Sequence, residues 1–255
     1  MNKRERTEQA KKTFLEFVKP GDVVNISNHP TIFQLPSFIG CWAIRKAQKS
    51  LFRFPEQYYH NDNYEIAFNP NEDTHSMVFF NECATFSVEP PKACWLDVED
   101  YVMDDISVYR YNEKILKDKD LTCMYGVAKE MIGGEYDIGQ LIDIAVNQIL
   151  GYAGHNEVTI FDAGKNRHVC SAGVAIIYQA WRKKLEIEQP RLFSKLNEMF
   201  PFWTPEFINE FKTEYKSDWF VEYTYPAMFG LTHSHFNYEM SLILKMKSGE
   251  IQYLS

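Results

Sequence analysis

The segment that begins at Cys170 has the clearest chemical potential in the sequence. Small residues follow this cysteine, and apolar residues then recur at helical spacing through Val174, Ile177 and Trp181. A cysteine at a helix N-terminus lies at the positive end of the dipole, beside unpaired N–H groups, which favours the thiolate. The same N–H groups, that of Ser171 among them, can hold an oxyanion. An inert core cysteine is the alternative and, for an isolated cysteine, the commoner case.

A thiolate and an oxyanion hole are half of a cysteine hydrolase, and the other half is a base, usually histidine, with a polar group to orient it. The elements that must position these groups can be read from hydrophobic spacing. We expect helices at 5–18, 41–52, 121–132, 138–150, 170–185, 192–199 and 205–211, with a helical turn at 96–102. Strands are expected at 23–26, 64–68, 76–80, 85–88, 106–111, 219–223 and 240–246, and a loop at 28–40.

The chain shows no internal repeat and no low-complexity linker, so we expect one α+β domain over residues 1–255. Its core is expected at about 20–210, preceded by a helix within 1–18 and followed by an extension at 212–255. The sequence leaves open whether that extension completes the sheet or covers a cleft.

Composition and charge exclude several classes of protein. The net charge is −8 and the basic clusters are short, which argues against a nucleic-acid partner. Five cysteines without a CxxC pair favour a reducing compartment. The charged N-terminus lacks the apolar core of a signal peptide, and no apolar run approaches the roughly 18 residues of a membrane span. We therefore expect a cytoplasmic protein without a bound cofactor, since no phosphate-binding glycine motif occurs either.

Seven short motifs follow one another in an order that resembles the circularly permuted papain-like hydrolases, the group related to NlpC/P60 that includes YiiX-like proteins. The first four are a Gly-Asp strand (21–24), a base strand (59–67), a Glu-Ala strand (81–84) and a strand ending in arginine (107–110). The last three are a Tyr-Asp step (134–137), a Cys-Ser helix start (169–171) and a Thr-Pro helix (202–205). The resemblance implies an antiparallel sheet packed against helices, with Cys170 as the nucleophile.

The resemblance also implies a base on an early strand. The family usually has histidine where Asn63 stands here, and His60 lies three positions earlier. His60 is therefore the predicted base, brought into place by an insertion or bulge. Glu82 on a neighbouring strand is the predicted orienting group, with Asp62 as the second choice.

The tyrosine of the Tyr-Asp step, Tyr136, resembles one that lies near the nucleophile in related hydrolases. Its hydroxyl is predicted to assist the oxyanion, and a core aromatic capping the helix is the alternative.

Other histidines offer further possibilities. His29, His75 and His155 are substitute bases if His60 does not serve. His233 and His235 could line one side of a strand, but no carboxylate or cysteine at ligand spacing accompanies them, so no metal site is predicted.

The predicted function is hydrolysis of an amide bond, as a peptidase or amidase, through a thioester on Cys170. The alternative is a papain-like domain that binds a peptide or protein without cutting it, which Asn63 at the expected base position would favour. The sequence leaves the substrate and the oligomeric state open.

Overall fold

The structure, a computed structural model, describes residues 2–28, 30, 35–51, 57–60, 62–111, 116–139, 142, 145–146, 167–199, 226 and 240–255. Its centre is a seven-stranded sheet in which every neighbouring pair is antiparallel. From edge to edge the strands are β11 (Glu250–Leu254), β10 (Met240–Lys247), β7 (Ile106–Tyr111), β1 (Val23–Ile26), β4 (His75–Asn81), β5 (Ala84–Val88) and β6 (Ala93–Leu96). Strands from both ends of the chain thus share one sheet, and β10 and β11 complete one edge.

Two small strand pairs stand outside this sheet. The first is a hairpin of β2 (Gln57–His60) and β3 (Glu65–Phe68). The second is a short parallel pair of β8 (Glu135–Tyr136) and β9 (Arg167–His168), which links the segment before α5 to the chain after α3.

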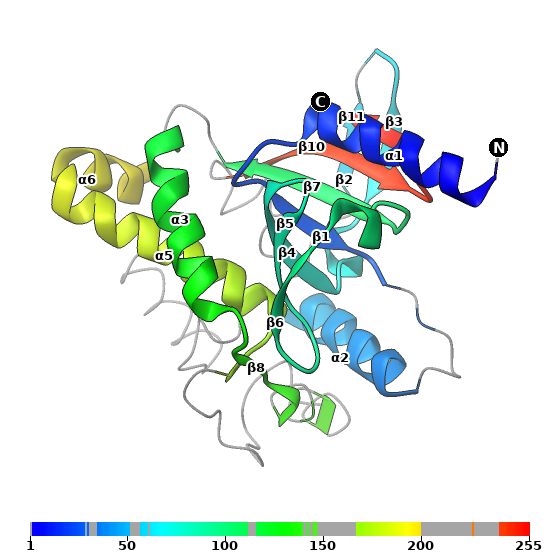
Figure 1. Cartoon of the computed structure of the whole chain (residues 1–255), viewed down its shortest axis with the longest axis horizontal. Helices are drawn as coiled ribbons and strands as arrows, with labels where there is room; N and C mark the ends of the chain where they lie inside the picture. The colour runs from blue at the N-terminus through cyan, green and yellow to red at the C-terminus, as the bar shows by residue number, and fades with distance from the viewer. Residues whose placement is uncertain are drawn as a thin grey trace.

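Helices cover both faces of the sheet (Figure 1). One face packs against α1 (Lys3–Phe17) and the 3-10 turn η2 (Val98–Asp100). The other packs against α2 (Leu35–Leu51), α3 (Asp118–Met131) and α5 (Cys170–Glu188), and α6 (Pro190–Met199) lies on α5. A further 3-10 turn, η1 (Pro70–Glu72), precedes β4.

The central strand β4 shows why these strands form where they do. Val78 and Phe80 belong to the core beneath the α2, α3 and α5 layer, while Met77 and Phe79 belong to the core beneath α1. Successive side chains of a strand point to opposite faces, so a strand covered on both faces must be apolar throughout. That is the run that predicts a strand at 76–80.

The α+β class and the antiparallel sheet are confirmed, as are the strands predicted at 23–26, 64–68, 76–80, 85–88, 106–111 and 240–246, each within about two residues. The helices predicted at 5–18, 121–132, 170–185 and 192–199 are also present. The predicted segment 138–150 is helical at its described positions, and 205–211 and 219–223 lie outside the described residues.

The loop predicted at 28–40 was wrong, and the strands β2, β6, β8, β9 and β11 were not predicted. The loop expected at 28–40 gives way to α2 at Leu35, since Pro36 lies in the first helical turn, where a missing N–H costs no hydrogen bond. The strand β11 pairs with β10 through a tight turn in which Ser248 and Gly249 both have positive φ. A glycine in such a turn is typical of a β-hairpin.

In the part of the chain that the structure describes, no helix has both the length and the apolar content to cross a membrane.

Candidate active site

Cys170 is the first residue of α5 and is 3% exposed. The helix start lies close against β5 because residue 173 is glycine. A Cβ at Gly173 would lie 2.7 Å from Val88 Cγ2 and 3.2 Å from Phe86 Cε1. The absence of a side chain there lets the first turn of α5 approach the sheet. This approach brings Cys170 to the start of β4.

The histidine that the structure places in contact with Cys170 is His75, the first residue of β4. The imidazole and the Cys170 side chain lie close enough for each to shift the pKa of the other. On its other side, His75 Nε2 lies 2.8 Å from Ser87 Oγ, which in turn donates to Glu89 Oε1 at 3.0 Å. Since the hydroxyl donates to Glu89, it accepts from Nε2–H, which leaves Nδ1 to face the sulfur.

Two backbone N–H groups, those of Ser76 and Ser171, lie close enough to the Cys170 sulfur to lower its pKa. The Ser171 group belongs to the first turn of α5, whose N–H groups have no partner within the helix. The pairing of β4 with β5 begins at Met77, one residue beyond Ser76. The end of the sheet ladder and the start of the helix thus each direct one donor at the sulfur.

These contacts set the charge of the site. Burial acts to raise the pKa of Cys170, but the charge and hydrogen bond of His75, with the two N–H groups, lower it below that of an ordinary thiol. Burial acts to lower the pKa of His75, but Cys170, Glu89 and Asp104 together raise it. Both shifts favour a thiolate beside an imidazolium.

The other cysteines with a shifted pKa move the opposite way. Burial raises the pKa of Cys41 in α2, although the neighbouring Thr74 side chain acts to lower it. The pKa of Cys83 is raised by its hydrogen bond to Asp97, and that of Cys94 by burial. A lowered pKa thus distinguishes Cys170 from these three.

Tyr136 lies close enough to Cys170 for the charge of the sulfur to act on its pKa. It pairs in β8 with His168, two residues before Cys170, and its N–H donates to Pro91 O at 3.0 Å. Its pKa is raised well above the ordinary value, first by burial and then by negative charge on Cys170 and Cys41. The hydroxyl therefore stays protonated and is able to donate a hydrogen bond to an oxyanion.

Glu82 is not at the site. It occupies the turn after β4, half exposed, and pairs with Lys11 Nζ at 2.6 Å. His75 begins the seven-residue strand that ends just before it, so at about 3.3 Å per residue the two lie about 20 Å apart. The sequence order placed Glu82 on a neighbouring strand, but the chain reverses at this residue, at the far end of β4.

The remaining predicted residues lie around the β2–β3 hairpin. Asp62 and Asn63 are exposed in the bend that joins the two strands. His60 ends β2 opposite Glu65, and its side chain is outside the described part of the structure. Four further histidines lie entirely outside the described residues: His29, His155, His233 and His235.

Sequence reasoning treated His75 as a loop residue and missed Ser87 and Glu89. A signal was present, because β4 and β5 form a hairpin whose register pairs Met77 with Ser87. Continuing this register by two residues places His75 opposite Glu89. Among the residues that the structure describes, no group of three or more His, Cys, Asp or Glu side chains is arranged to hold a metal ion.

No known family model matches this chain, and no curated protein matches it. The function must therefore be inferred from the geometry around Cys170.

Proposed function

We propose that this protein is a cysteine-dependent hydrolase, a peptidase or amidase on a permuted papain-like fold, with Cys170 as nucleophile and His75 as base. The observation that carries the proposal is the contact between Cys170 and His75 at the N-terminus of α5. A nucleophile, a base within reach of it and a group that orients the base are the minimum set for this chemistry. Ser87, backed by Glu89, is the orienting group.

The proposed reaction has two halves. The Cys170 thiolate attacks the carbonyl carbon of the amide, and the oxygen takes up negative charge that the first-turn N–H groups and the Tyr136 hydroxyl can stabilise. The His75 imidazolium then gives its proton to the leaving nitrogen as the C–N bond breaks. A water molecule that loses a proton to His75 attacks the resulting thioester, and the C–S bond breaks to restore the thiolate.

The raised pKa of His75 favours an amide over an ester as substrate. An amine is a poor leaving group unless it is protonated, so the imidazole must hold a proton at working pH and deliver it to nitrogen. Cys170 raises the His75 pKa most, and Glu89 and Asp104 add to this. An ester would need this acid less.

The alternative of a binding domain without activity was motivated by the absence of a histidine at Asn63. The contact between His75 and Cys170 removes that motivation, because a different histidine now accounts for the base.

The test is the rate of Cys170 alkylation by iodoacetamide as a function of pH, with the modified cysteine identified by peptide mass spectrometry. In the wild type we expect a midpoint below about 8.5, the value of a free thiol. In His75→Ala the midpoint should rise above 8.5, because burial continues to act on the thiol after the imidazolium is gone. His60→Ala is the matched control and should leave the profile unchanged.

A wild-type midpoint at or above 8.5, or one that depends on His60 rather than His75, would refute the proposed pair. Hydrolysis itself is then measured on a library of fluorogenic peptide amides. Cys170→Ser, which keeps the shape of the site, should abolish any turnover that the wild type shows.

A further inference from the structure

A row of buried polar side chains crosses the sheet beside the proposed site. Ser76 in β4 pairs in register with Asn25 in β1, Asn25 pairs with Ser107 in β7, and Ser107 pairs with Lys245 in β10. All four residues are at most 9% exposed. Polar groups in a sheet centre are costly unless each is hydrogen-bonded, so a row of this kind needs a partner that satisfies it.

That partner is Asp73, which is fully buried two residues before His75. Its Oδ1 accepts from Ser27 Oγ at 2.8 Å and Ser107 Oγ at 3.4 Å. Its Oδ2 accepts from Asn25 Nδ2 and Tyr109 OH, both at 3.0 Å. One carboxylate thus ties β1 and β7 to the chain that leads into β4.

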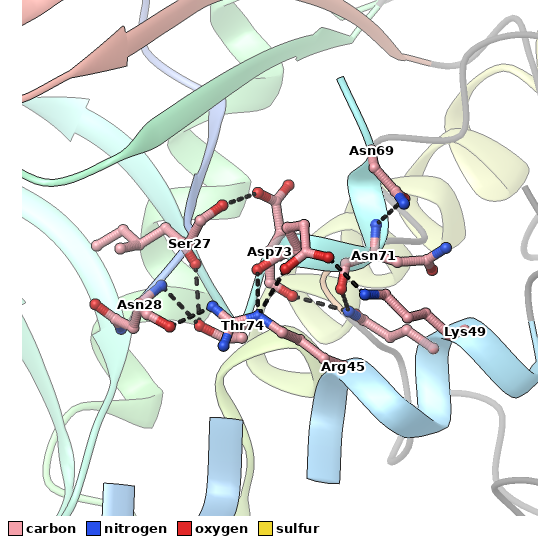
Figure 2. Close-up of polar contacts among 11 residues, drawn as sticks. Ser27, Asn28, Arg45, Lys49, Asn69, Asn71, Asp73 and Thr74 are labelled. Atoms are coloured by element: carbon pink, nitrogen blue, oxygen red, sulfur yellow. Dashed lines mark hydrogen bonds and ion pairs between the residues drawn. The ribbon is translucent and has the colours of Figure 1, made fainter. Parts of the chain in front are cut away.

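The same chain is held from the α2 side (Figure 2). Gln48 Nε2 donates to the backbone oxygens of Asn71 and Asp73, both at 2.9 Å, and Arg45 Nε donates to Glu72 O at 3.3 Å. Thr74 N–H donates to Ile26 O at 2.8 Å. The peptides that precede His75 are therefore fixed between β1 and α2.

The row also reaches the nucleophile. Asn25 Oδ1 accepts from Ser76 Oγ at 2.7 Å, and the N–H of the same Ser76 lies close enough to the Cys170 sulfur to lower its pKa. The connection runs from Asp73 through Asn25 to Ser76 and then to Cys170. Its last link is the only one that touches a reacting atom.

We infer that Asp73 and Asn25 are positioning residues that hold the Ser76 N–H on the Cys170 sulfur. The inference rests on the proposed function for its catalytic meaning. A hydrogen bond to a charged sulfur depends strongly on direction, so a small rotation of the peptide before Ser76 weakens the stabilisation of the thiolate. The buried row restricts that rotation from the far side of the sheet.

The test compares the pH profile of Cys170 alkylation in Ser76→Ala and Asp73→Asn with the wild type. Ser76→Ala keeps the backbone N–H and removes only the hydroxyl that bonds to Asn25. Complete loss of one hydrogen bond to a charged group corresponds to about a tenfold effect, so a weakened Ser76 N–H contact should lower the rate at pH 6 by up to about tenfold in each variant. The profile midpoint should rise accordingly.

The matched control is Tyr101→Phe, which removes another buried hydroxyl bond, to Thr85 Oγ1 at 2.8 Å, beneath the opposite face of the sheet. It should lower the unfolding midpoint in urea and leave the alkylation profile unchanged. If Asp73→Asn does not fold, Ser76→Ala decides the outcome.

An alkylation profile within twofold of the wild type in folded Ser76→Ala would overturn the inference and reduce the row to a structural role. That outcome differs from a failure of the proposed function, in which the wild-type thiol itself would show no lowered midpoint.

Discussion

The close approach of α5 to β5 gives the sharpest test of how the fold positions the nucleophile, through the substitution Gly173→Ala. The new Cβ would lie 2.7 Å from Val88 Cγ2, about 1 Å inside ordinary carbon contact, and 3.2 Å from Phe86 Cε1. Val88 is 1% exposed and Phe86 is fully buried, so neither side chain has room to withdraw. Overpacking of this kind costs about 1–3 kcal/mol.

Alanine also favours a helix over glycine by about 1 kcal/mol, which opposes that cost. We therefore expect Gly173→Ala to lower the free energy of unfolding by up to about 2 kcal/mol. The control is Gly126→Ala in the middle of α3, where a Cβ meets nothing within 4 Å. It has the same helical gain without the clash, so it should raise stability by about 1 kcal/mol.

The two variants are compared by urea unfolding and by alkylation of Cys170 at pH 6. If the helix start moves outward to relieve the clash, the contact between Cys170 and His75 lengthens, and alkylation should slow in Gly173→Ala alone. A Gly173→Ala protein as stable as Gly126→Ala and equally reactive would refute the argument that residue 173 sets the position of Cys170.

The remaining predictions concern charges at and away from the site. Glu89→Gln removes one of the negative charges that raise the pKa of His75, so the imidazole should titrate at lower pH, measured by NMR of the ring protons; an unchanged titration would exclude that role. Glu82→Gln should leave the alkylation rate of Cys170 unchanged, since Glu82 follows the end of β4 opposite to His75. Slower alkylation would support Glu82 as the orienting group. Asp22 is 2% exposed, and its carboxylate accepts two hydrogen bonds from the Arg110 guanidinium. Arg110→Leu removes this charged partner and should lower the free energy of unfolding, measured in urea, by about 3 kcal/mol. A loss below about 1 kcal/mol would contradict this.

Local sequence determines much of the framework. The strands at 23–26, 76–80 and 106–111 and the helix that begins at Cys170 follow from apolar spacing over a few residues, and the structure has them at those positions. Cys170 is recognisable as a candidate nucleophile for the same reason, because its position at the helix start depends only on its neighbours in the chain.

The partner of Cys170 depends on tertiary structure. His60 and His75 are both histidines ahead of Cys170 in the chain, and nothing in their neighbouring residues determines which one the helix start meets. The choice follows from the antiparallel pairing of β4 with β1 and β5 and from the close approach that Gly173 allows. Apart from the β4–β5 hairpin, these contacts join residues about 50 to 85 positions apart. Their energies arise from packing and strand register, which a short window of sequence does not specify.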